Sequence, residues 1–311
     1  MKGCFTLFDM ENKNQQQDHQ QQPDTKYPQP PFPEQKQDYP GTEALMKPLA
    51  DHGEKSYKGS GKLTNRKVIL TGGDSGIGKA VAIAFAREGA DIVLCYLDDL
   101  EDEDAHDTAK YVEEAGRKCV LVKGDITSED HCKSIVDNAV QAFGRIDILV
   151  NNAAFHMARK SLQDIPADEW TRTFAVNVHS IFYLCKAAEP HMRPGSSIIN
   201  TTSVNTFSPS DDLLPYAATK AAVENLTANL SQILLQQGKG IRVNAVAPGP
   251  VWTPLITSTK WHDAANFGKN TPLGRPGQPA EIAPAFVFLA SEESSYISGA
   301  MIPATGGRIT I

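Results

Sequence analysis

Short apolar runs alternate with longer segments of helical period from about residue 66 onward. The runs are rich in β-branched residues, and several are apolar throughout, which is typical of parallel strands buried on both faces. They predict strands at 67–70, 91–97, 119–124, 146–152, 196–200, 241–247 and 300–304. Helical periodicity predicts helices at 77–88, about 104–115, about 129–142, 168–192, about 216–237 and 280–290. This alternation predicts an α/β fold, with one doubly wound, seven-stranded parallel sheet flanked by helices.

The first 60 residues do not follow this pattern. Residues 15–40 contain nine Gln and six Pro and almost nothing that could fill a core, so ordering them alone costs more entropy than burial returns. We expect an extended N-terminal arm over 1–60, flexible or draped on the surface, and a single folded domain over 61–311.

Composition narrows the function further. A net charge of −7 without a basic stripe gives no footprint for nucleic acid, and no run approaches the roughly 20 apolar residues of a membrane span. The opening residues lack the features of a secretory signal. Five widely spaced cysteines without a CxxC pair argue for reduced thiols and against a metal site. We therefore expect a cytoplasmic protein that acts on a small molecule, with no metal.

A glycine-rich turn follows the first predicted strand. Gly72, Gly76 and Gly78 stand between that strand and the next helix. Such a turn lets backbone amides approach a pyrophosphate at the positive end of the helix, as in Rossmann-type domains. A plain tight turn is the alternative, since glycines also close ordinary turns.

Three reactive side chains are predicted to meet at the carboxyl ends of the strands. Tyr216 and Lys220 are four residues apart, so they lie on one face of a helix. Ser203 directly follows the strand at 196–200, thirteen residues before the tyrosine. The Tyr/Lys pair alone could be a chance surface contact, but ligands of doubly wound sheets bind at this end.

These motifs together resemble the short-chain dehydrogenase/reductase family. The resemblance rests on TGxxxGxG at the glycine turn, NNAA at 151–154, Asn177, Ser203, the Tyr216/Lys220 pair and PGP at 248–250, in order from about residue 60 to 307. The stretches YPQPPFPEQ, GSGKL, TGGDSGIG and VAPGPVWTPL look most like a bacterial branch of glucose dehydrogenase-like and general-stress aldehyde reductases. The resemblance implies an NAD(P)-dependent oxidoreductase acting on the CH–OH or carbonyl group of an aldehyde, ketone, sugar or polyol.

The resemblance also implies the catalytic roles. Tyr216 would be the acid/base, although a free tyrosine with a pKa near 10 is a poor base. The Lys220 ammonium would lower that pKa by roughly 1–3 units, and Ser203 would orient the substrate oxygen. Asn177 would hold a water in a proton relay with Lys220, or simply bond backbone inside its helix.

Cofactor contacts are carried over by position. Asp125 would bind the adenine amino group or act as a loop acid, Asn151 would line the ribose, and Thr253 would meet the carboxamide. Tyr96 stands where an acid would select the ribose 2′-hydroxyl, so NADP(H) is slightly favoured over NAD(H). The full set is Gly72, Ser75, Gly76, Ile77, Gly78, Tyr96, Asp125, Ile126, Asn151, Asn152, Ala153, Tyr216, Lys220, Pro248, Gly249, Val251 and Thr253.

The segment 253–275 is long for a loop in a compact domain, which predicts either a lid over the substrate or a plain surface loop. If it is a lid, Trp261, His262 and Phe267 are candidate specificity residues. His156 and His191 are interpreted as structural, because neither belongs to a spaced metal set.

Other classes of function remain open at this stage. A catalytically silent NAD(P)-binding regulator would keep the fold, and an interaction protein would act through its Gln/Pro arm. The resemblance further implies a homotetramer built on the helices at 168–192 and 216–237.

Overall fold

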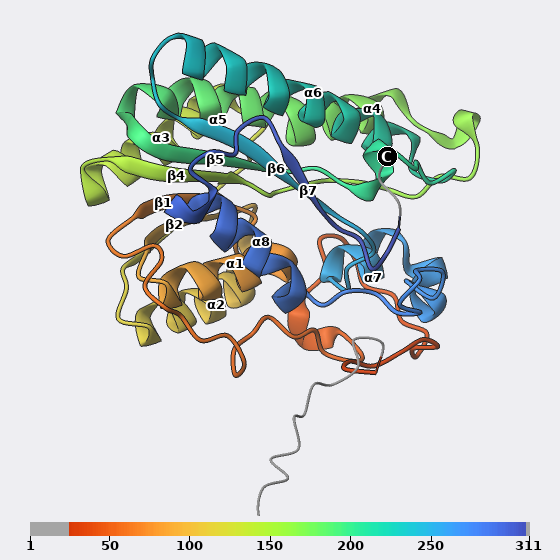
Figure 1. The fold of residues 1–311 in the computed structure, drawn as a ribbon. Coiled ribbons are helices and arrows are strands. Elements are labelled where there is room, and N and C mark those ends of the chain that lie inside the picture. Colours follow the sequence, from red (N-terminus) through yellow and green to blue (C-terminus); the bar gives the residue numbers. More distant parts are fainter. Residues whose placement is uncertain (1–24, 309–311) are drawn as a thin grey trace, which may run out of the picture.

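The computed structural model of this protein describes residues 25–308, and the predictions for 1–24 lie outside them. Its sheet has seven strands, all parallel, in the order β3-β2-β1-β4-β5-β6-β7 (Figure 1). The strands are β1 (Lys67–Thr71), β2 (Asp91–Tyr96), β3 (Cys119–Lys123), β4 (Ile146–Asn151), β5 (Met192–Thr201), β6 (Arg242–Pro248) and β7 (Met301–Ala304). The strand order reverses direction between β1 and β4, so the predicted doubly wound α/β fold is confirmed.

Helices cover both faces of the sheet (Figure 1). On one face lie α1 (Gly76–Arg87), α2 (Asp102–Glu114) and α8 (Pro279–Ala290), and on the other lie α3 (Glu129–Phe143), α4 (Ala167–Phe174), α5 (Ser180–Ala188) and α6 (Leu214–Gln236). Successive side chains of β1 alternate between the two layers. Val68 and Leu70 join the core under α1 and α8, whereas Ile69 joins the core under α3 and α5. Both faces of the strand are therefore buried, as its uninterrupted apolar run predicts.

Two predicted elements differ from the structure. The helix expected at 168–192 is interrupted by a π-helical turn at Ala175–His179, between α4 and α5. The segment 253–275 contains α7 (Pro254–Thr259) and a 3₁₀ helix at Trp261–Asn266, where the sequence predicted a loop.

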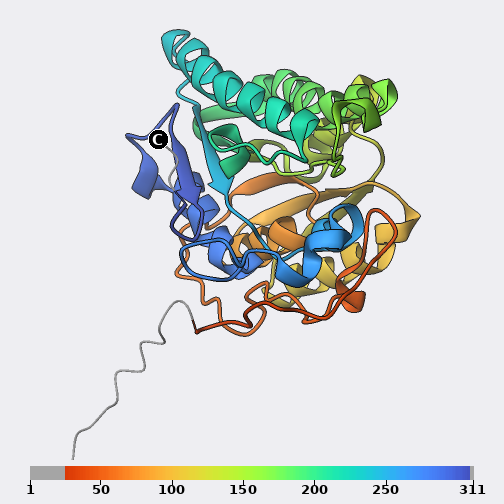
Figure 2. The ribbon, with the colours of Figure 1, turned by 90° about the vertical axis from the view of Figure 1, so that its right-hand side faces the viewer.

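The described part of the arm, residues 25–60, lies along the domain beside α7 (Figure 2). Phe32 packs against Trp252 with ring centroids 4.6 Å apart, and the Trp252 indole donates a hydrogen bond to the Pro48 carbonyl at 2.8 Å. Met46 is 2% exposed in the same small cluster. Because the apolar side chains of the arm pack against those of the domain, the arm is ordered without a core of its own.

None of the helices between residues 25 and 308 is long and apolar enough to cross a membrane. Within the same range, no group of three or more His, Cys, Asp or Glu side chains is arranged to hold a metal ion.

Candidate active site

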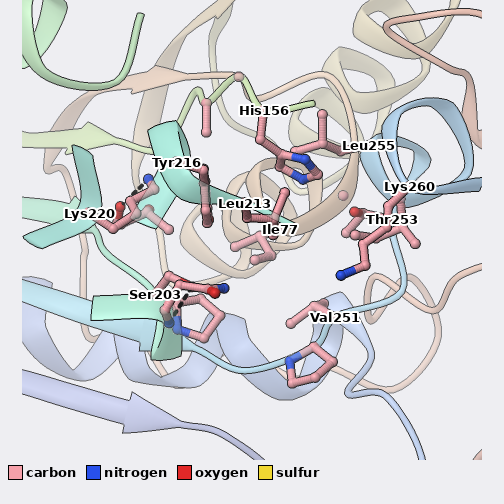
Figure 3. Close-up of a pocket in the computed structure, with 18 of the residues that line it drawn as sticks. Ile77, His156, Ser203, Leu213, Tyr216, Lys220, Val251, Thr253, Leu255 and Lys260 are labelled. Atoms are coloured by element: carbon pink, nitrogen blue, oxygen red, sulfur yellow. Dashed lines mark hydrogen bonds between the residues drawn. The ribbon is translucent and has the colours of Figure 1, made fainter. Parts of the chain in front are cut away.

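A cavity of about 600 Å³ opens at the carboxyl ends of the strands. It runs from the ends of β2 and β3, past the turn between β1 and α1, to the end of β5 and the start of α6. Figure 3 shows side chains from the start of α1, the end of β5, α6 and α7 around one space. This is the place where ligands bind in doubly wound sheets.

The glycine turn is shaped by close backbone packing. Gly72 has φ +60° and Gly76 has φ +51°, conformations that side chains with a Cβ rarely adopt. A Cβ on Gly78 would lie 1.7 Å from the Gly72 carbonyl oxygen. The Asn152 amide donates to that same oxygen at 2.9 Å, which fixes the turn from the β4 side. The first turn of α1 therefore presents its backbone directly to the cavity.

Ser203, Tyr216 and Lys220 meet at the other end of the cavity, as predicted from their spacing (Figure 3). The Lys220 ammonium lies 5.3 Å from the centre of the Tyr216 ring and donates to the Thr201 carbonyl at 2.6 Å. Lys220 is 2% exposed and Ser203 is 5% exposed. The phenol, the hydroxyl and the amine therefore lie close together, and little of the serine and lysine surface is exposed to solvent.

Burial dominates the protonation of this corner. It raises the pKa of Tyr216 to about 12, although the hydrogen bond with Ser203 acts in the opposite direction. Burial also lowers the pKa of Lys220 to about 7. The pKa of Tyr216 therefore lies above its ordinary value, contrary to the lowering by Lys220 that the sequence led us to expect, and the phenol is protonated at neutral pH.

Asn205 and His156 are two of the lining side chains that were missed from the sequence. Asn205 donates to Ser203 Oγ from its backbone N–H at 3.1 Å and from its amide at 3.3 Å. Because both bonds use the lone pairs of the serine oxygen, the hydrogen bond between Ser203 and Tyr216 uses the serine hydroxyl hydrogen, which is the group that Ser203 could turn toward a ligand oxygen. Asn205 lies in a short 3₁₀ helix at Val204–Thr206, and no spacing pointed to it.

His156 is the second residue missed. We had interpreted it as structural, but its ring lines the cavity and lies 5.1 Å from the Tyr216 ring, edge to face. Burial, helped by Lys260 and Lys220, lowers the pKa of His156 to about 3. The Thr259 hydroxyl donates to the Leu255 carbonyl and so accepts from His156 Nδ1 at 3.1 Å. This network assigns Nε2 as a hydrogen-bond acceptor.

Three predicted site residues do not line the cavity. The amide of Asn151 donates to Asn200 on β5 at 2.8 Å, so it joins two strands and does not reach a ribose. Asn177 is fully buried in the π-helical turn. Its side-chain oxygen accepts from the Phe155 N–H, and its side-chain nitrogen donates to the Phe155 carbonyl and to the Thr219 hydroxyl. Gly78 lies beneath the turn, where it allows helix and strand to approach.

The remaining predicted residues line one continuous surface. Near the ends of β2 and β3, Asp125 pairs with Arg172 of α4 at 2.5 Å. Thr253 precedes α7 and faces Gly76, where an added Cβ would approach its methyl group to 3.0 Å. The lining residues predicted from sequence are Gly72, Ser75, Gly76, Ile77, Tyr96, Asp125, Ile126, Asn152, Ala153, Ser203, Tyr216, Lys220, Pro248, Gly249, Val251 and Thr253.

Of the three candidate specificity residues in the segment 253–275, one lines the cavity. Phe267 lines the cavity and is 9% exposed. Trp261 is 45% exposed and carries the Lys36 ammonium of the arm over its ring, and His262 faces Asp212 at 4.0 Å. Instead, Leu255 and Lys260 of this segment point into the cavity (Figure 3).

Comparisons with known proteins agree with this geometry. A family model described as Enoyl-(Acyl carrier protein) reductase matches residues 72–308. An uncharacterised oxidoreductase of Escherichia coli, YghA, is 47% identical over 292 residues, which cover 93% of this chain and 98% of that protein. The glucose and ribitol dehydrogenase of Daucus carota is 44% identical, covering 89% and 96% respectively.

A solved structure resembles the chain as well. The short-chain dehydrogenase of Burkholderia cenocepacia in complex with NADP superimposes with a TM-score of 0.73 at 31% identity, covering 79% of this chain and 98% of its own. The motifs at the cavity agree with three findings: the matching family model, the identity to relatives over nearly their whole length, and the shared fold. The chain belongs to the short-chain dehydrogenase/reductase family and is an NAD(P)-dependent oxidoreductase.

Proposed function

We propose that this protein transfers a hydride between a nicotinamide cofactor and the carbonyl or alcohol carbon of a small substrate, with Tyr216 as acid/base. One observation carries the proposal: Ser203, Tyr216 and Lys220 converge in the cavity that the glycine turn also lines. When bound there, the reduced dinucleotide would supply the hydride to a carbonyl, and the protein would supply the proton.

Each side chain has a part in that step. The Tyr216 phenol, protonated at neutral pH, would donate its proton to the substrate oxygen. Ser203, whose oxygen already accepts two bonds from Asn205, would donate a hydrogen bond to the same oxygen and hold it in place. Lys220, anchored on the Thr201 carbonyl, lies beside the tyrosine and would stabilise a developing phenolate.

The backbone at the other end fits a dinucleotide. Where Gly78 lies, a Cβ would be 1.7 Å from Gly72 O, so helix and strand are in contact with no room between them. That approach brings the N-terminus of α1 to the cavity, where a pyrophosphate would be bound by backbone amides.

We propose NADP(H) as the preferred cofactor. Tyr96, at the end of β2, supplies no carboxylate against a 2′-phosphate. Two nearby carboxyl groups, Asp74 and Glu101, also line the cavity, but burial raises the pKa of both, that of Glu101 to about 6. A carboxyl group whose pKa is raised carries less negative charge at a given pH, which weakens its repulsion of a phosphate.

The polar lining around Tyr216 supports a substrate with several hydroxyl groups. His156 offers an acceptor, and Lys260 donates to Asp212 at 3.0 Å and lies 3.4 Å from Ser210 at the cavity wall. Sugars and polyols supply matching donors and acceptors, which apolar aldehydes and ketones do not. The name of the carrot relative, glucose and ribitol dehydrogenase, is consistent with this substrate class.

The deciding experiment is a titration of the full chain with NADPH and NADH, followed at 340 nm by a screen of aldehydes, ketones, sugars and polyols. We expect binding of both nucleotides, tighter for NADPH, and turnover of at least one polyhydroxylated substrate. Binding without turnover of any compound would favour the silent regulator. If neither nucleotide binds, the proposed function is wrong.

The raised pKa of Tyr216 predicts different pH profiles for the two directions. Reduction needs the protonated phenol, which is present throughout pH 6–9, so its rate at saturating cofactor should stay nearly constant. Oxidation needs the deprotonated form, whose fraction grows at most about tenfold per pH unit below the pKa. Initial rates in both directions from pH 6 to 10 test this, and an oxidation rate independent of pH would contradict it.

We also propose a homotetramer in the cytoplasm. The faces of α4, α5 and α6 expose apolar side chains, among them Trp170, Phe182, Ile233 and Leu235, which are 40–53% exposed. Light scattering at micromolar concentration should give four times the chain mass, and Phe182→Asp should lower it. Leu162→Asp, on an exposed leucine outside these helices, is the control. A monomeric wild type would rule the tetramer out.

A further inference from the structure

The N-terminal arm borders the cofactor cavity. Tyr39 and Pro40 line it together with the residues of the domain. The Burkholderia structure covers 79% of this chain with 98% of its own length, so about a fifth of this chain has no counterpart in it. The family model begins at residue 72, so Tyr39 and Pro40 are cavity residues that lie outside it.

Tyr39 lies at the end of the cavity that would hold the adenosine. In a doubly wound sheet the ends of β2 and β3 face the adenosine half of a dinucleotide, and Tyr96 and Ile126 mark those ends here. The charged groups that act on the Tyr39 hydroxyl come from the same loops, Glu101 and Asp98 after β2 and Asp125 after β3, together with Arg172 of α4.

The Tyr39 ring is suited to contact a base. It packs edge to face on Phe155, with centroids 5.4 Å apart, and burial, followed by the Glu101 charge, raises its pKa to about 12. The side chain is therefore neutral at physiological pH and offers an aromatic surface with one hydroxyl. Aromatic rings bind nucleobases by stacking, whichever base is present.

Contacts on both sides hold this part of the arm in place. Towards α7, Ser258 donates to the Pro40 carbonyl at 3.0 Å, and Gly41, at φ +83°, is so close that a Cβ would lie 2.8 Å from the Pro254 carbonyl oxygen. Towards the glycine turn, the Glu43 carboxylate accepts a hydrogen bond from the Gly76 N–H at 2.6 Å. The backbone N–H of Glu43 donates to the Asp104 carboxylate at 3.0 Å.

His52 completes this anchor. Its Nε2 lies 2.8 Å from Glu43 and its Nδ1 lies 3.0 Å from Glu54. Burial alone would lower the pKa of His52, but the carboxylates of Glu43 and Glu54 have the larger effect and raise it to about 9. A protonated histidine therefore compensates the buried Glu43 charge beside the turn that would receive a pyrophosphate.

We propose that Tyr39 and Pro40 of the arm form part of the outer wall of the adenosine subsite, with Tyr39 in contact with the adenosine of the bound dinucleotide. The inference rests on the proposed dinucleotide binding, because the subsite has no meaning without it. Glu43 is a positioning residue, which fixes the glycine turn without touching the base.

The test compares the affinity of the full chain for AMP, which carries only the adenosine half, and for NADPH. Tyr39→Ala should raise both dissociation constants about tenfold, the usual effect of one lost aromatic–base contact. Tyr39→Phe keeps the ring and should stay within about threefold of the wild type.

Tyr27→Ala is the matched control. Tyr27 is a partly buried tyrosine of the same arm, it bonds Asp51 at 2.9 Å, and it does not line the cavity. It should lower the melting temperature without changing the affinity for AMP. An unchanged affinity in Tyr39→Ala, or equal losses of affinity in Tyr39→Ala and Tyr27→Ala, would overturn this inference and leave the proposed function intact. A wild type that binds neither AMP nor NADPH would overturn the proposed function and this inference together.

Discussion

Tyr216→Phe should lower turnover at least about a thousandfold, because it removes the only proposed proton donor and leaves the ring in place. The substitution deletes one oxygen whose hydrogen-bond partner is Ser203, and the phenyl ring keeps its contact with His156. The melting temperature should therefore change by no more than a few degrees. Stopped assays with the best substrate of the screen, at saturating cofactor, provide the measurement.

Tyr111→Phe is the matched control for this prediction. Tyr111 is a partly buried tyrosine on α2 beside the Lys79 ammonium, and it does not line the cavity. Its loss of a phenol oxygen should leave turnover and cofactor affinity unchanged. Half-normal rates in Tyr216→Phe would rule out the proposed acid/base mechanism, whereas lost binding of NADPH would show that the variant damages the site and not only the chemistry.

The sheet could be predicted from the sequence because its strands are buried on both faces. Residues 92–97 form one apolar run, and β2 is buried from Asp91 to Tyr96. α7 could not be predicted in this way. Its side of the molecule is completed by the arm, through Phe32 on Trp252, and such a contact between residues more than 200 positions apart leaves no local period.

The same distinction applies to the site. Ser203, Tyr216 and Lys220 were found because each lies at a fixed distance from the end of a strand or along a helix. His156 and Glu101 were not found, because they reach the cavity only through tertiary packing. Glu101 belongs to the acidic run at 98–104, yet it accepts from the Leu97 N–H at 2.7 Å and lines the cavity.

Gly78→Ala should abolish measurable cofactor binding, with a loss of at least about a hundredfold in affinity, or roughly 2.7 kcal/mol. An added Cβ would lie 1.7 Å from the Gly72 carbonyl oxygen and 2.8 Å from the Asn152 amide nitrogen. Ordinary contacts begin near 3.5 Å, so α1 must shift by roughly 1.5 Å or more away from the turn. That shift moves the N-terminus of α1 away from the place where a pyrophosphate would bind.

Stability should fall in the same variant, since overpacking costs about 1–3 kcal/mol or more and the better helix propensity of Ala returns only about 1. For a domain of this size we expect a melting temperature lower by roughly 2–8 °C. Gly277→Ala is the control, because Gly277 has no positive φ and its nearest neighbours lie 3.8 Å from an added Cβ. Normal NADPH affinity in Gly78→Ala would mean that the approach of α1 to β1 does not form the pyrophosphate site. The dinucleotide would then have to be held from the β4 and β6 side of the cavity alone.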